Sequence, residues 1–185
     1  REEQRAAELE EVTEFQQERL AGLDPESMGL FLRQGLRGKL REREERSGRS
    51  AEETEALLLD YDRWVAGADF TGLGLETLAA QILEPALEEI GEGFETQPRV
   101  RASLLQTVAT TARELGLLDL AEAPQREALA TRRRVLGDEH PNTLASIYNL
   151  GALLDDQGKL SAAEPYLREA LESNRRVLGD EHPYT

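Results

Sequence analysis

The chain lacks cysteine and has few residues that favour β-strands. Its 185 residues include no cysteine, 4 Phe, 4 Tyr and 1 Trp. Without cysteine there is no disulfide framework, no thiol nucleophile and no cysteine-based zinc site. Valine and isoleucine together occur 9 times, against 31 leucines and 22 alanines. Because leucine and alanine favour helices, the composition predicts an all-α fold.

Long apolar runs and an excess of basic residues are also absent. No run of 18 apolar residues exists, so the sequence predicts no membrane insertion, and its start has no secretory signal pattern. The 37 acidic residues outnumber the 22 Lys and Arg, which gives a formal net charge of −15. This charge argues against a nucleic-acid partner, because nucleic-acid binding requires basic patches that face phosphates.

The negative charge is concentrated in the first half of the chain. Residues 1–93 hold 23 acidic and 11 basic residues, whereas residues 94–185 hold 14 acidic and 11 basic residues. We therefore expect an acidic helical N-terminal region at 1–93 and a second region after it. Because the chain begins with Arg1, we interpret it as a fragment of a longer protein.

Helix signals divide the acidic region into several segments. Apolar spacing predicts a helix over 1–22, and Asp24 followed by Pro25 marks the start of the next helix. Ser50 and Glu53 have capping-box spacing, which predicts the start of a third helix. The other expected elements are the end of that helix near Trp64, a loop at 67–74, a helix at 75–83, and a helix that Pro85 starts or kinks and that reaches about Phe94.

The second half contains an internal repeat with an offset of 42 residues. The string Leu-Gly-Asp-Glu-His-Pro at 136–141 recurs at 178–183. Aligning residues 116–143 with residues 158–185 gives 18 identities in 28 positions without a gap. Because so specific a string does not recur by chance in a chain rich in leucine and alanine, we expect each unit to form the same supersecondary structure.

Each unit is expected to be a pair of helices. Apolar residues recur at steps of three and four along 142–157 and again along 160–178, with Gly158 between the two stripes. The earlier unit has matching positions at 100–115 and 118–136. This spacing predicts two helix pairs of the same structure.

The pattern resembles the tetratricopeptide repeat, whose motif is aromatic-x2-Leu-Gly-x2-Tyr followed by Ala-x3-Phe. Aliphatic residues replace the aromatic ones here, and the long period resembles the kinesin light chain type of repeat. The resemblance implies an α–α superhelix in which the small residues Gly151 and Ala163 allow close helix packing. The implied units are 94–141, which is more degenerate, and 142–183, with Thr185 matching the start of a third. The motif positions in the later unit are Ile147, Leu150, Gly151, Leu154, Ala163 and Leu167.

The first half resembles the segment ahead of the repeats in bacterial serine/threonine protein kinases with C-terminal tetratricopeptide arrays. In that family the kinase domain comes first, often followed by a membrane-spanning helix. The resemblance therefore implies a parent kinase and either a cytoplasmic location or a membrane tether outside this segment. It rests on residues 14–16, 23–25, 28–29, 83–87 and 97–102.

No motif in the sequence indicates a catalytic site or a metal site. His140 and His182 lie one repeat apart, which is about 20 Å for two packed helices, so they cannot share a metal ion. The glycine pairs at 72–74 and 91–93 lack the third glycine of a phosphate loop. The catalytic motifs of protein kinases are also absent. We therefore expect no enzyme activity and no cofactor in this chain.

The resemblance also implies that the first helices of the two units hold a partner peptide on their inner face. Asn149 offers an amide that donates and accepts hydrogen bonds, and Tyr148 offers a flat apolar contact. We name the expected residues the predicted binding face. They are Ser103, Gln106, Thr107, Thr110 and Arg113 in the earlier unit, and Tyr148, Asn149, Ala152 and Asp155 in the later unit.

The sequence therefore predicts a protein–protein interaction module from a larger bacterial signalling protein, with a protein or peptide as its partner. One alternative is a non-catalytic regulatory or linker region of a serine/threonine kinase. A further alternative is the sensor arm of a signalling ATPase or protease. We also expect weak self-association through the C-terminal end, where Leu167, Leu171 and Leu178 border apolar surface that a following unit covers.

Overall fold

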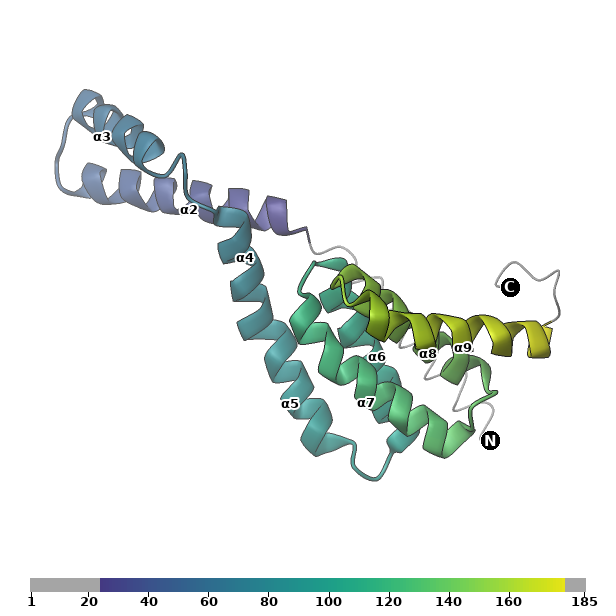
Figure 1. The fold of residues 1–185 in the computed structure, drawn as a ribbon. Coiled ribbons are helices and arrows are strands. Elements are labelled where there is room, and N and C mark those ends of the chain that lie inside the picture. The colour runs from purple at the N-terminus through teal and green to yellow at the C-terminus, as the bar shows by residue number, and fades with distance from the viewer. Residues whose placement is uncertain (1–23, 179–185) are drawn as a thin grey trace. The chain divides into compact units, whose positions relative to one another are not determined.

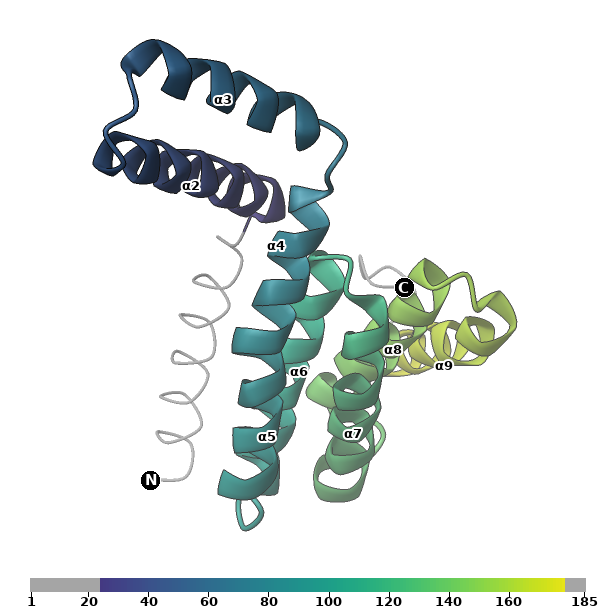
Figure 2. The same ribbon diagram turned by 90° about the vertical axis from the view of Figure 1, so that its left-hand side faces the viewer.

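The computed structural model describes residues 24–178, which form helices joined by short connections (Figures 1 and 2). They divide into two compact units, residues 24–78 and the residues from 79 onward. Within the described range no strand occurs, so the all-α prediction is confirmed. None of the helices in this range is long and apolar enough to cross a lipid bilayer. The expected helix at 1–22 and the repeated connector at 179–183 lie outside the described residues.

Side-chain caps fix the starts of two helices in the first unit. The carboxylate of Asp24 accepts hydrogen bonds of 3.1 and 3.3 Å from backbone N–H groups of the first turn. Ser50 and Glu53 form the predicted capping box, with reciprocal side-chain and backbone bonds. The helices of this unit are α2 (Pro25–Arg46), α3 (Ala51–Trp64) and α4 (Phe70–Leu78).

The expected loop at 67–74 is wrong in its second part, because α4 already begins at Phe70. Asp69 stabilises this start, since its carboxylate accepts the N–H of Gly72 at 2.7 Å. A close crossing with α2 also holds it, because a Cβ atom at Gly29 would lie only 2.8 Å from the carbonyl carbon of Phe70. The helix start therefore depends on a contact between residues that are far apart in the sequence.

The second unit begins with η1 (Ala79–Leu83), a π-helical turn, followed by α5 (Glu84–Gly93). Pro85 has no N–H group and cannot donate an α-helical hydrogen bond, which accounts for the irregular turn just before it. The prediction that Pro85 starts or kinks a helix is confirmed, and the expected helix at 75–83 is divided between α4 and η1. Both η1 and α5 contact α6 (Pro98–Glu114), so this compact unit begins before the change in charge.

The repeat forms two helix pairs, α6 with α7 (Leu118–Leu136) and α8 (Pro141–Asp156) with α9 (Leu160–Leu178) (Figure 2). All bounds lie within two residues of the predicted ones. Gly116 and Gly158 end the first helix of each pair with φ angles of 79° and 72°, which favour glycine. In both turns the N–H after the glycine donates a 2.8 Å bond to a carbonyl of the last helical turn.

A close contact between α8 and α9 is made possible by Gly151. A Cβ atom at this position would lie 2.7 Å from Cδ2 of Leu167 and 3.2 Å from its backbone nitrogen. The predicted close approach at Gly151 is therefore confirmed. The surrounding core residues are Leu129, Leu144, Ile147, Leu150, Leu154, Ala163 and Ala170.

Apolar side chains on α9 remain partly accessible. Leu171 is 38% exposed and Leu167 is half-buried, while the side chain of Leu178 lies outside the described residues. Leu129 is the counterpart of Leu171 in α7 and is buried. The expected self-association through this end stays a prediction.

Replacing Gly151 by leucine should lower the free energy of unfolding by about 1–3 kcal/mol, because the new side chain overlaps Leu167. Gly93→Leu is a matched control, since no atom lies within 4 Å of the Cβ position at this glycine. Urea unfolding of both variants and the wild type measures the effect. Equal stability of the two variants would contradict the packing at Gly151.

Candidate partner-binding face

The structure brings the predicted binding face together on α6 and α8, which contact one another. Tyr148 is 56% exposed, and Asp155 is also exposed. Gln106 and Thr107 are buried, with exposed fractions of 7% and 3%, so the structure does not place their side chains at the surface. The remaining members are half-buried: Ser103, Thr110, Arg113, Asn149 and Ala152.

Gln106 is buried because its amide is bonded within the protein. Its Nε2 donates to Oε1 of Gln125 on α7 at 2.6 Å, and Nε2 of Gln125 donates back to Oε1 of Gln106 at 3.1 Å. Ser146 on α8 donates its hydroxyl to Gln106 at 2.9 Å, and its carbonyl accepts from Gln125 at 3.1 Å. Two amides therefore connect three helices through bonds that satisfy their buried polar atoms.

Arg132 on α7 joins this group of side chains. Its Nη1 lies 2.7 Å from Oγ of Ser146, 3.1 Å from the carbonyl of Asn142 and 3.3 Å from Oε1 of Gln106. Burial lowers the pKa of Arg132 from its ordinary value. All three contacts are with uncharged oxygen atoms. We name Gln106, Gln125, Arg132 and Ser146 the polar junction.

The polar junction includes residues that the sequence interpretation does not find, because that interpretation considers only the first helix of each unit. The repeat offset nevertheless contains a signal. Gln125 corresponds to Leu167, and Arg132 corresponds to Asn174. At both positions the first unit has a more polar residue than the second. Such differences between aligned units indicate polar contacts that only the first helix pair makes.

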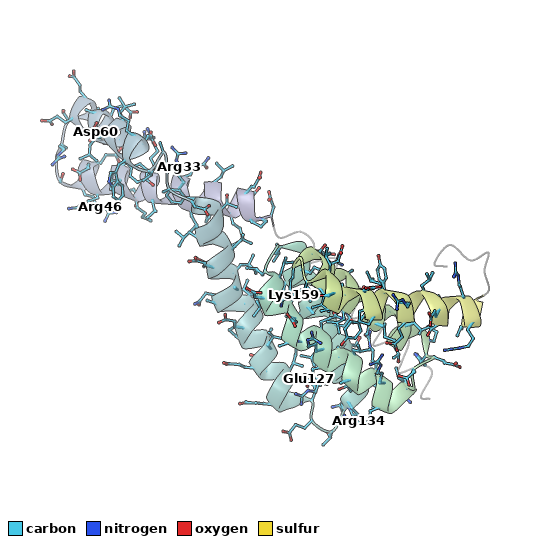
Figure 3. All side chains as sticks on the ribbon, in the orientation of Figure 1. Arg33, Arg46, Asp60, Glu127, Arg134 and Lys159 are labelled. Atoms are coloured by element: carbon cyan, nitrogen blue, oxygen red, sulfur yellow. The ribbon has the colours of Figure 1, made fainter. Side chains whose placement is uncertain are left out.

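An ion pair joins α7 to the turn between α8 and α9. Glu122 accepts hydrogen bonds from Nζ of Lys159 at 2.7 Å and from Nε of Arg126 at 2.9 Å. The bond from Lys159, followed by that from Arg126, lowers the pKa of Glu122 to about 2. Figure 3 labels Lys159 among the side chains of this part of the molecule. A second pair joins α6 to α8, where Nε of Arg113 lies 2.5 Å from Asp156.

His140 begins α8, as expected for a connector residue. Its Nδ1 atom accepts the N–H of Asn142 at 3.1 Å, which makes it the N-cap of the helix. Among the described residues, no group of three or more His, Cys, Asp or Glu side chains could hold a metal ion. His182 lies outside the described residues.

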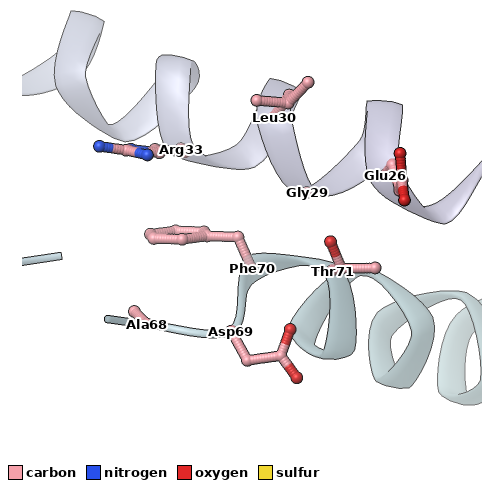
Figure 4. Close-up of a pocket in the computed structure, with 8 residues that line it drawn as sticks. All are labelled: Glu26, Gly29, Leu30, Arg33, Ala68, Asp69, Phe70 and Thr71. Atoms are coloured by element: carbon pink, nitrogen blue, oxygen red, sulfur yellow. The ribbon is translucent and has the colours of Figure 1, made fainter. Parts of the chain in front are cut away.

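A pocket of about 340 Å³ lies within the first unit, between α2 and the start of α4 (Figure 4). Gly29 and Arg33 on α2 lie on one side of this pocket, and Phe70 lies on the other. Glu26 and Asp69 add carboxylates, but the lining contains no histidine, cysteine or lysine. These residues do not form an arrangement of nucleophile and base, so the pocket has no evident catalytic chemistry.

The helices α6, α7 and α8 carry the predicted binding face and the polar junction, and α9 completes the second helix pair. Residues 100–176 match the tetratricopeptide repeat family. The match spans less than half of the chain and ends within α9. No curated protein matches the chain. The region 98–178, named the tetratricopeptide region below, is therefore a helical tetratricopeptide solenoid, a fold that is typically non-catalytic and binds proteins.

Glu122→Gln should lower the free energy of unfolding of the tetratricopeptide region above pH 4.5. The difference from the wild type should become smaller as the pH falls toward 2. The folded-state pKa of about 2 lies below the ordinary value of 4.5, so the ionised carboxylate stabilises the fold above pH 4.5. That stabilisation disappears as the pH falls through this window. Urea unfolding at several pH values measures the difference between variant and wild type.

Glu164→Gln is the matched control, because Glu164 corresponds to Glu122 and is exposed, with an ion pair to Arg168. Its effect on stability should be smaller, since exposed ion pairs contribute little. The same pH dependence for both variants would contradict the role assigned to Lys159.

Proposed function

We propose that the tetratricopeptide region is a protein–protein interaction module that holds a partner segment across α6 and α8. The observation that carries this proposal is the exposed Tyr148 beside the half-buried amide of Asn149 on α8. A tyrosine gives a partner a large apolar contact with a hydroxyl at its tip, and the amide can pair with a partner backbone. The polar junction joins α6, α7 and α8, which supports a rigid placement of the helices that carry these side chains.

A second candidate is a non-catalytic regulatory or linker region of a bacterial serine/threonine kinase. The observation in its favour is the separate compact unit at 24–78, which precedes the tetratricopeptide region. In this candidate the first unit positions an enzyme, and recognition of a peptide is not required. Kinase motifs encoded ahead of Arg1 would support this candidate, whereas peptide recognition at Tyr148 would support the first one.

Peptides that bind the wild-type chain can be selected from a random display library. Tyr148→Ala should weaken the binding of these selected peptides. We expect Kd to rise at least about fivefold, because truncating a tyrosine anchor typically costs more than ~1 kcal/mol. Fluorescence polarisation with the selected peptides measures Kd, and circular dichroism confirms that each variant is folded.

Ser161→Ala is the control, since Ser161 is exposed on α9, away from the predicted binding face. Its Kd should change by less than about twofold, within the range of ordinary surface substitutions. The proposed face would be contradicted if the selected peptides bind Tyr148→Ala and Ser161→Ala as tightly as the wild type. Failure to enrich any peptide from the library would also contradict it.

A further inference from the structure

Arg132 presents a guanidinium group whose two edges have different surroundings. Its Nη1 atom is occupied by the oxygen atoms of Gln106, Asn142 and Ser146. Its Nε and Nη2 atoms have no hydrogen-bond partner in the part of the chain that the structure describes. Neither atom is completely shielded from solvent. The Nε–Nη2 edge is therefore the part of the polar junction that can still donate hydrogen bonds.

Two other arginines of α7 have carboxylate partners, whereas Arg132 has none among the described residues. Arg126 pairs with Glu122, and Arg133 pairs with Glu169. No carboxylate within residues 24–178 forms an ion pair with Arg132. A desolvated cation without a counter-ion is unfavourable, so an anion at its free edge would be stabilised.

The helix-pair architecture does not require a positive charge at this position. The corresponding residue of α9 is Asn174, which is uncharged. An amide is also sufficient to donate a hydrogen bond to a carbonyl or a hydroxyl. The charge of Arg132 therefore exceeds what is needed to hold α8 against α7. It is specific to the polar junction, which shares Gln106 with the predicted binding face.

We propose that the Nε–Nη2 edge of Arg132 binds the carboxylate of an acidic side chain in the partner segment. The two N–H groups of this edge are parallel and match the two oxygen atoms of a carboxylate. The polar junction thereby selects Asp or Glu at one position of the partner. This inference rests on the proposed function for the identity of the partner, and the affinity for a carboxylate can be tested without that partner.

Acetate is the probe for the site in the full chain labelled with ¹⁵N-arginine. Proton–nitrogen correlation spectra at constant ionic strength follow the Nε–Hε signal of Arg132, which Arg132→Lys assigns by its loss. We expect a saturable shift that is half complete on the order of 10 mM acetate, a typical affinity for so small a ligand. Arg134, which is exposed on α7, is the internal reference and should show only a small, linear shift.

Two results of this titration would overturn the proposal. The first is the absence of a saturable shift at Arg132, or the same response at Arg134. The second is tighter saturable binding of inorganic phosphate than of acetate, because it would assign the site to phosphorylated residues in place of carboxylates. A response to acetate at lower concentration than to phosphate would support the proposal.

The peptides selected by display separate this inference from the proposed function. We expect an acidic residue at one position of these peptides, and at least about fivefold weaker binding to Arg132→Lys, which keeps the charge but loses the bidentate edge. Peptides that lose affinity for Tyr148→Ala but bind Arg132→Lys unchanged would overturn the acidic preference and leave the proposed function standing. A saturable acetate shift without any enriched peptide would support the anion site and contradict the proposed function.

Discussion

The reciprocal hydrogen bonds between the amides of Gln106 and Gln125 are the constraint on which the arrangement of α6, α7 and α8 depends. Both side chains are buried, and a buried amide is stable only when its donors and acceptors are bonded. Their mutual bonds fix α6 against α7, and the bonds to Ser146 fix α8 against both. The predicted binding face lies on α6 and α8, so its geometry depends on this junction.

The two helix pairs share their local structure and differ at their centres. Gly116 and Gly158 end the first helix of each pair with the same left-handed turn. At the centre, Gln125 of the first pair is replaced by Leu167, which packs against Gly151 in the second pair. An apolar contact fills space without direction, whereas bonded amides favour one arrangement of the helices. The polar centre therefore distinguishes the α6–α8 junction from the rest of the repeat.

Features with local signals could be predicted from the sequence, and features that depend on distant contacts could not. The repeat offset locates α6 to α9 within two residues, and the small residue Gly151 at a motif position predicts the close packing of α8 on α9. The start of α4 at Phe70 is not predicted, because it depends on the crossing with Gly29. The burial of Gln106 is also missed, since the partner that satisfies it, Gln125, lies on a different helix. The spacing of residues along one helix shows which side chains share a face of that helix. It does not show which other helix packs against that face.

A double-mutant cycle on Gln106 and Gln125 tests the dependence on the polar junction most directly. Urea unfolding of Gln106→Leu, Gln125→Leu and the double variant gives the three losses of stability. Each single change leaves a buried amide without its partner, so we expect each to lose about 1–3 kcal/mol. The double variant should lose less than the sum of the two, by at least about 0.5 kcal/mol, because it removes both partners together. Losses that simply add would contradict the claim that the two amides hold the helices as a unit.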